Sequence, residues 1–178
     1  MRFYEALDLE PKLALDIDDL KRRFYERSRQ WHPDRFTRRS PEEQEKALEM
    51  TAVLNDAFRT LRDPNARAAY FFKGKGIELP KEAPPEVLKE FFELNMELDE
   101  LRGGDESVRP QVATAYERIL EMREQTDAAL AGLFELYDRN EDMRPTLIAT
   151  AGDLLNVRRY ISNYVRAAGK ELNVPLPN

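Results

Sequence analysis

A single proline between two helical patterns is the feature that most constrains the fold of this 178-residue chain. Pro33 lies in the run Trp31-His32-Pro33-Asp34-Arg35-Phe36, which holds the only histidine and the only tryptophan of the sequence. Proline has no backbone N–H to donate, and it drives the preceding residue away from helical geometry. A helix that approaches this run must therefore end near Gln30, and the chain turns before another helix begins.

The segments on both sides of the motif have the 3- and 4-residue apolar spacing of amphipathic helices. The first starts from an N-cap at Asp16 or Asp18. The second opens with Ser40-Pro41-Glu42-Glu43, a capping box with proline in the first helical position. Together they predict a helical hairpin that carries His32-Pro33-Asp34 at its tip.

The order of the segments around the motif resembles the J domain, the module that stimulates the ATPase of DnaK/HscA-type chaperones. A short apolar segment with Phe3, Tyr4 and Leu7 comes first, followed by the basic helix, the motif and a long helix. A further helix closes the arrangement between Asp63-Pro64 and Tyr70. The resemblance covers residues 1 to about 72, and it implies that the motif contacts a chaperone ATPase.

Charge is unevenly distributed along the chain. Residues 21–39 contain eight basic and two acidic side chains and so carry +6, whereas the whole chain carries a formal −6. Such a basic stripe favours one local contact surface, and an ordinary solvated helix face is the alternative. With the motif beside it, docking on an acidic surface of the ATPase is the better interpretation. The predicted chaperone-binding residues are His32, Pro33, Asp34, Lys21, Arg22, Tyr25, Arg29 and Arg35.

A stretch rich in proline divides the chain. Residues 76–85 contain three prolines and one glycine, as in a linker. We therefore predict a J domain at 1–75, a linker at 76–84 and a C-terminal domain at 85–178.

The C-terminal domain shows three helical patterns. They extend from Pro85 to about Arg102, from a cap at Ser107 to about Tyr137, and over 145–168 with Gly169 as the stop. Because short connections join long helices, we predict an antiparallel three-helix bundle and an all-α fold for the chain.

The resemblance extends from the J domain to one family, the HscB co-chaperones of iron–sulfur cluster assembly. It rests on the run 61–70 with Gly76-Ile77-Glu78-Leu79, on the acidic and apolar segment 91–101, and on 159–164. It implies that the J domain docks on a HscA/DnaK-type ATPase while the bundle delivers an IscU-type scaffold protein. Delivery of a different client is the alternative. Some members carry a metal-binding N-terminal cysteine pair, but this sequence has no cysteine.

The helical segment that starts at Pro85 has more apolar surface than one core stripe requires. Phe92 and Met96 are four residues apart, so they share a second face of the helix. This pattern and the HscB resemblance predict a client face with an acidic rim. Packing of Phe92 and Met96 against the J domain is the alternative. The predicted client-binding residues are Leu88, Phe92, Glu93, Met96, Glu100 and Tyr160.

Other classes of function find little support. His32 and Asp34 flank a proline on a loop and lack a nucleophile or third partner, so we expect no catalytic residue and no enzyme. Without cysteine there is no disulfide, thiol catalysis or Cys-ligated metal, and we expect neither metal nor cofactor. The acidic remainder of the chain opposes nucleic-acid binding. No apolar run approaches membrane-spanning length, so we expect a cytoplasmic protein without a membrane partner.

Overall fold

The structure, a computed structural model, describes residues 1–175, and every regular element among them is a helix. The all-α prediction is therefore confirmed. The chain divides into two units, Met1–Glu78 and Leu79–Asn178. The division falls inside the segment 76–84. Residues 176–178, which end the predicted C-terminal domain, lie outside the described part of the chain.

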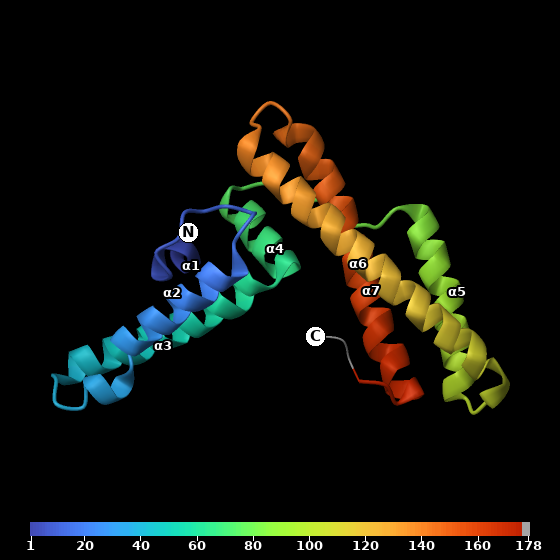
Figure 1. Ribbon diagram of the computed structural model, residues 1–178, viewed down its shortest axis with the longest axis horizontal. Coiled ribbons are helices and arrows are strands. Elements are labelled where there is room, and N and C mark those ends of the chain that lie inside the picture. The colour runs from blue at the N-terminus through green and yellow to red at the C-terminus, as the bar shows by residue number, and fades with distance from the viewer. Residues whose placement is uncertain (176–178) are drawn as a thin grey trace. The chain divides into compact units, whose positions relative to one another are not determined.

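The first unit is built from four α-helices and one 3-10 turn (Figure 1). The elements are α1 (Arg2–Ala6), α2 (Ile17–Gln30), η1 (Pro33–Arg35), α3 (Pro41–Arg62) and α4 (Pro64–Gly74). Asp16 caps α2, and its carboxylate accepts the backbone N–H of Asp18 at 2.8 Å. At α3 the predicted capping box is present, with Ser40 Oγ and the Glu43 carboxylate each accepting the other's backbone N–H. Side-chain oxygens thus satisfy the first amides of both hairpin helices.

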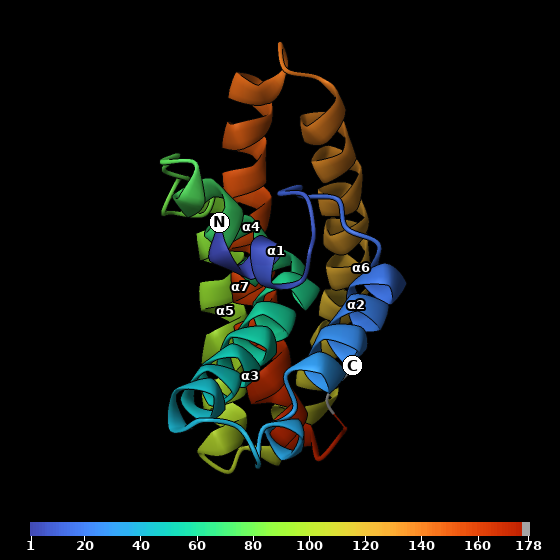
Figure 2. The same cartoon turned by 90° about the vertical axis from the view of Figure 1, so that its left-hand side faces the viewer.

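Helix α3 is the centre of this unit, because it contacts α1, α2 and α4. Leu54 and Leu61 of α3 are fully buried, and so are Leu20 of α2 and Tyr4 of α1. Figures 1 and 2 show α2 and α3 side by side, with α1 and α4 at the end of the hairpin away from the turn. The tip with His32 therefore lies outside the main core and depends on local contacts for its shape.

The second unit contains α5 (Pro85–Arg102), η2 (Glu106–Val108), α6 (Arg109–Arg139) and α7 (Arg144–Leu172). Its core is shared by all three long helices, with Phe91 and Leu98 of α5, Ile119 of α6, and Ile161 and Tyr164 of α7. Because α5 has 18 residues against 31 in α6, it covers only part of the α6–α7 pair (Figure 1). The predicted three-helix bundle is confirmed along α5, and beyond it α6 and α7 continue as a two-helix hairpin.

Two predicted helix boundaries in this unit are wrong, namely the start of α6 and the end of α7. Ser107 does not cap α6; Asp105 instead accepts the Ser107 backbone N–H at 3.0 Å and caps the short turn η2. Gly169 does not stop α7, which continues to Leu172 and ends at Asn173 with a left-handed φ of 57°. Gly169 is buried inside the helix, and asparagine supplies the left-handed cap that the sequence analysis assigned to glycine.

Residues 79–84, named the strap here, lie along α7. The Asn156 side-chain amide donates to the carbonyl oxygens of Pro80 at 2.9 Å and Glu82 at 3.0 Å. Gly152 leaves room for the proline, since a Cβ at this position would lie 2.3 Å from Pro80 Cδ. Ala83 is buried as well. The second half of the predicted linker therefore belongs to the second unit.

Candidate functional site

The turn between α2 and α3 presents the motif to solvent. His32 adopts an extended conformation, and Pro33 begins the 3-10 turn that follows it. His32 Nδ1 accepts the Asp34 backbone N–H at 3.3 Å, while Asp34 Oδ2 lies 3.5 Å from the same nitrogen. The side chains of His32 and Asp34 are 58% and 85% exposed. Both are therefore accessible to a partner protein.

Three contacts hold this turn in place. The Arg35 guanidinium donates to the carbonyl oxygen of Arg29 in the last turn of α2 at 3.2 Å. The rings of Trp31 and Phe36 stack across the motif, 5.8 Å apart and nearly parallel. From α3, Thr51 Oγ1 donates to the Trp31 carbonyl oxygen at 3.1 Å. The sequence analysis did not identify Thr51, because a threonine on a helix flank carries no spacing signal.

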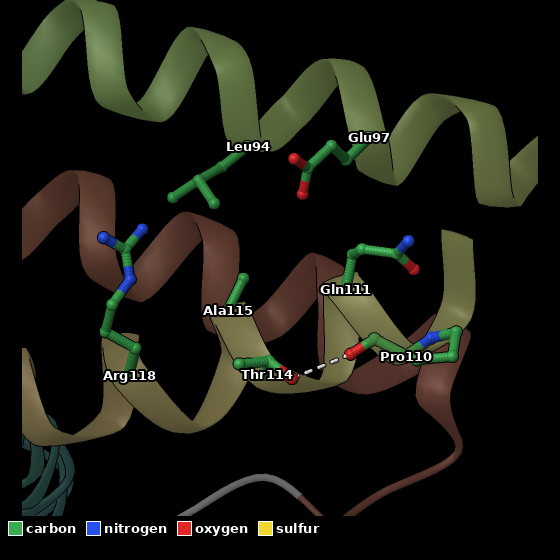
Figure 3. A pocket seen from close by; sticks show the side chains of 7 residues that line it. All are labelled: Leu94, Glu97, Pro110, Gln111, Thr114, Ala115 and Arg118. Carbon is green, nitrogen blue, oxygen red and sulfur yellow. Dashed lines mark hydrogen bonds between the residues drawn. The ribbon is translucent and has the colours of Figure 1, made fainter. Parts of the chain in front are cut away.

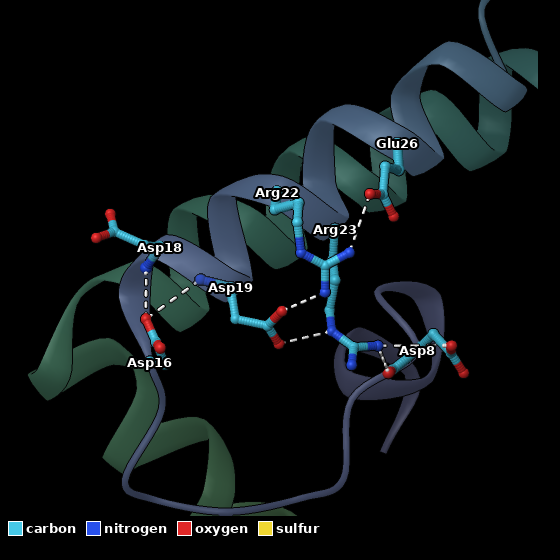
Figure 4. Close-up of polar contacts among 7 residues, drawn as sticks. All are labelled: Asp8, Asp16, Asp18, Asp19, Arg22, Arg23 and Glu26. Atoms are coloured by element: carbon cyan, nitrogen blue, oxygen red, sulfur yellow. Dashed lines mark hydrogen bonds and ion pairs between the residues drawn. The ribbon is translucent and has the colours of Figure 1, made fainter.

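The basic face of α2 is partly neutralised by acidic residues of the same helix. Asp19 lies between Arg22 and Arg23, and Arg22 also pairs with Glu26 at 2.9 Å (Figure 4). Hydrogen bonds from Arg23 and then Arg22 hold the pKa of the Asp19 carboxyl below its ordinary value. The hydrogen bonds that Arg22 donates to Asp19 and Glu26 raise the pKa of its guanidinium. The +6 counted over residues 21–39 thus overstates the free charge, because the count began after Asp18 and Asp19.

The remaining predicted chaperone-binding residues of α2 differ in their contacts. Lys21 is exposed and pairs with Asp18 at 3.2 Å. Tyr25 is 62% exposed and lies beside Phe24, with ring centroids 5.6 Å apart. Arg29 is exposed and makes no ion pair among residues 1–175. Arg29 is therefore the cation on this face whose charge is not already compensated.

Phe92 and Met96, the apolar pair of the predicted client face, lie on a different face of α5 from its buried core residues. Phe91 and Leu94 are buried, whereas Phe92 is 66% exposed and Met96 52% exposed. These two exposed side chains lie one helical turn apart on the outer side of α5. Large apolar side chains at such exposure leave their surface available for a partner.

The rest of the predicted client set surrounds this pair. Tyr160 of α7 is half-buried, and its ring centroid lies 5.7 Å from that of Phe91, which places it beside α5. Leu88 is half-buried too, so it serves both the core and the surface. Glu93 is exposed with Lys89 4.0 Å away, and Glu100 is exposed without an ion pair in the described chain. Two exposed acidic residues thus share α5 with the exposed apolar pair, and the client face stays a prediction.

On its other flank, α5 forms an open groove with α6. The groove has a volume of about 410 Å³, and Figure 3 shows Leu94 and Glu97 of α5 facing Ala115 and Arg118 of α6 across it. Arg118 pairs with Glu90 at 3.1 Å at its edge. Tyr164 of α7 lies near Glu97. Its burial, and to a smaller extent the Glu97 charge, raises the pKa of Tyr164 to about 12. None of the predicted site residues lines this groove.

Comparisons with known proteins agree with this arrangement. The DnaJ domain family model matches residues 2–70. The chaperone HscB from Vibrio cholerae matches the structure with a TM-score of 0.73 and 24% sequence identity, and the match covers 96% of both chains. The human co-chaperone protein HscB matches with a TM-score of 0.69 and 23% identity over 95% of this chain and 81% of the human chain.

Residues 2–70 therefore form a DnaJ domain, as the sequence predicted for this part of the chain. Along nearly its whole length the chain also has the fold of HscB. The fold therefore agrees with the sequence resemblance to HscB.

Two other kinds of site are absent from the described residues. Among residues 1–175 no helix is both long and apolar enough to cross a bilayer. In the same part of the chain, no three acidic or histidine side chains gather where they would hold a metal ion.

Proposed function

We propose that this protein is a co-chaperone that stimulates the ATPase of a HscA/DnaK-type chaperone and has no catalytic activity of its own. The observation that carries the proposal is the exposed His32-Pro33-Asp34 turn at the tip of a J-domain hairpin, beside the basic face of α2. We assign the contact with the ATPase to the turn and to Lys21, Arg22, Tyr25, Arg29 and Arg35.

The proposed contact is partly electrostatic. The exposed cations of α2 would meet an acidic surface on the chaperone and speed the encounter. Salt would slow association, because the screening length falls to about 8 Å at physiological ionic strength. Tyr25, exposed among these cations, would supply apolar contact area at the centre of the interface.

The test of the chaperone contact is the steady-state ATPase rate of the Hsp70-type chaperones from the same organism, with and without this protein. Wild type is expected to raise the rate of one of them, and His32→Gln and Asp34→Asn to abolish the increase. Neither side chain contributes to a core, so the circular dichroism and melting temperature of both variants should match wild type. Equal stimulation by wild type and both variants would contradict the proposal.

We further propose that α5 binds the protein that is delivered to the chaperone, through Leu88, Phe92, Glu93, Met96, Glu100 and Tyr160. The exposure of Phe92 and Met96 supports this, since apolar side chains buried at the centre of an interface contribute most of its affinity. We propose an iron–sulfur scaffold protein of the IscU type as the client. HscB, whose fold this chain shares, is the basis for that choice.

The client face is tested by replacing Phe92 and Met96 together with serine. Affinity for the scaffold protein, measured by calorimetry, is expected to fall by more than about 2 kcal/mol, or roughly 30-fold. The matched control is Leu136→Ser with Met143→Ser, which changes two exposed apolar residues elsewhere in the second unit, 48% and 44% exposed. Its affinity should equal wild type. Loss of stability in the first variant with normal binding would assign Phe92 and Met96 to packing instead.

The second candidate is a J-domain co-chaperone that delivers a different client. Wild-type protein that stimulates the ATPase but does not bind the scaffold would favour it. In either form of the proposal, the protein acts in the cytoplasm. The absence of cysteine from the sequence is compatible with the reducing conditions of that compartment.

A further inference from the structure

The carbonyl oxygen of Trp31, at the C-cap of α2, has no backbone donor. In a continuing helix the N–H four residues later would reach it, but the Arg35 N–H donates to His32 O at 2.9 Å instead. Pro33 has no N–H to offer. A carbonyl at a helix end that is not exposed to water requires another partner, and Trp31 is only half-exposed.

Thr51 of α3 supplies that partner. Its hydroxyl lies 3.1 Å from Trp31 O and 2.8 Å from the Ala47 carbonyl oxygen one turn earlier in its own helix, so these two acceptors share its single hydrogen. Within residues 1–175 this is the only side-chain hydrogen bond from α3 to the segment 31–36. The Trp31–Phe36 stack and the Arg35 bond to Arg29 connect the turn to itself and to α2, so neither sets its position relative to α3.

We propose that Thr51 is a positioning residue, which holds the His32-Pro33-Asp34 turn in register on α3 through its hydrogen bond to Trp31 O. The inference rests on the proposed function, since a fixed turn matters only if a partner reads it. Loss of the bond would leave the turn in its docking-competent position for a smaller fraction of the time. Apparent affinity for the chaperone falls in proportion to that fraction.

Two substitutions of Thr51 separate the hydroxyl from the shape of the side chain. Thr51→Val removes the hydroxyl and keeps the branched side chain, whereas Thr51→Ser keeps the hydroxyl. Thr150→Val on α7 is the control, because Thr150 makes only the bond to the carbonyl four residues earlier, at 3.3 Å. Any effect of losing that common helix bond appears in the control as well.

The first readout needs no chaperone. Trp31 is the only tryptophan, so its fluorescence quenching by acrylamide reports on this turn alone. Hydrogen exchange of the Arg35 and Phe36 amides, which bond within the turn, reports on its opening. Thr51→Val is expected to speed this exchange about fivefold, the change that loss of one ordinary hydrogen bond produces. It should also raise quenching, whereas Thr51→Ser stays within about twofold of wild type by the same principle.

The second readout is the protein concentration that gives half-maximal stimulation of the ATPase. Thr51→Val should raise this concentration by less than the fivefold change in exchange, because the docking-competent fraction falls by a smaller factor than the opening constant rises. The maximum should be unchanged, and Thr51→Ser and Thr150→Val should match wild type. Unchanged exchange and quenching in Thr51→Val would overturn the positioning role, and so would an equal defect in Thr51→Ser. If wild type fails to stimulate any chaperone, the proposed function fails, and the exchange data still decide whether Thr51 positions the turn.

Discussion

Tyr164 shows how one buried atom affects stability. Its hydroxyl has almost no solvent-exposed surface and no hydrogen-bond partner in the described chain, and its ring lies in the core of the second unit. A buried polar group without a partner costs free energy, whereas its removal is nearly neutral or favourable. We therefore expect Tyr164→Phe to leave the free energy of unfolding at pH 7 unchanged or to raise it by about 1 kcal/mol. A loss of stability in chemical denaturation would mean that the hydroxyl has a partner.

The same side chain predicts a pH dependence. Burial raises the pKa of Tyr164 to about 12, above the value of about 10 in an unfolded chain. A raised pKa means that the folded state holds the proton more tightly, so stability is complete below pH 10 and declines as pH rises toward 12. The decline amounts to about 2 to 3 kcal/mol. Unfolding of wild type and Tyr164→Phe compared across this range should show a smaller decline in the variant, which keeps the contribution of Tyr137, whose pKa is also raised by burial. Equal alkaline losses in both proteins would contradict the assignment.

Arg22 and Arg29 differ in how free their charges are. Arg22 gives up bonds to Asp19 and Glu26 before it contacts a partner, whereas Arg29 has no ion pair to break. We expect Arg29→Ala to slow association with the chaperone ATPase several-fold, and Arg22→Ala to slow it less. Stopped-flow measurements at about 50 and 150 mM salt give the rates, and both effects should shrink at the higher salt. Arg139→Ala in the second unit is the control. A larger effect at Arg22 would contradict this ranking.

Sequence spacing placed both arginines on one face of α2, but it could not rank them. Their difference depends on side-chain conformation, namely on which arginine reaches Asp19 and Glu26. For the same reason Thr51 was not identified, since its role depends on the distance between two helices. Patterns in the chain identify faces, whereas partners within a face depend on the folded geometry.

At the scale of elements, the strap explains why two glycines should respond differently to replacement by alanine. Gly152 lies where a Cβ would meet Pro80, while a Cβ on Gly132 of α6 would meet nothing within 4 Å. The same change to alanine should therefore have opposite effects. Gly152→Ala is expected to destabilise the protein by about 1 to 3 kcal/mol through overpacking. Gly132→Ala should stabilise it by about 0.5 to 1 kcal/mol through helix propensity. Thermal unfolding measures both, and stabilisation by Gly152→Ala would contradict the packing of the strap.

A second measurement on the strap is proteolysis. Asn156 supplies two of its hydrogen bonds, and the Arg159 guanidinium adds a third to the Lys81 carbonyl oxygen at 3.3 Å. Asn156→Leu removes both amide bonds at similar size, so trypsin should cleave after Lys81 faster than in wild type. Arg139→Ala again serves as the control. An unchanged cleavage rate would mean that the strap is held by packing alone.

Some helix boundaries follow from local sequence and others do not. Ser40 and Asp63 cap α3 and α4, because a short side chain reaches the amides of its own first turn. The predicted cap at Ser107 is wrong, because α6 begins after Val108 without a side-chain cap. Gly169 was predicted to end α7, but it is buried within the helix, and packing overrides its low helix propensity.

At the scale of the whole molecule, each unit has one proposed contact. The J domain is proposed to bind the chaperone, and α5 is proposed to bind the client. Both sets of residues are sequence predictions that the fold does not test, and the two units meet within the predicted linker 76–84. The sequence could not decide whether Phe92 and Met96 are accessible, because a second apolar face serves equally for binding or for packing. In the structure both side chains are exposed, which supports the client-binding proposal.

The central claim is that one chain carries two separable binding sites that act together on the chaperone. The most direct measurement is the ATPase rate with His32→Gln and with the Phe92→Ser, Met96→Ser variant, each with and without the scaffold protein. We expect His32→Gln to bind the scaffold normally and give no stimulation. The double variant should stimulate as wild type does without scaffold and should gain nothing when scaffold is added, whereas wild type gains. A double variant that responds to the scaffold as wild type does, or a His32→Gln protein that still stimulates, would contradict the account.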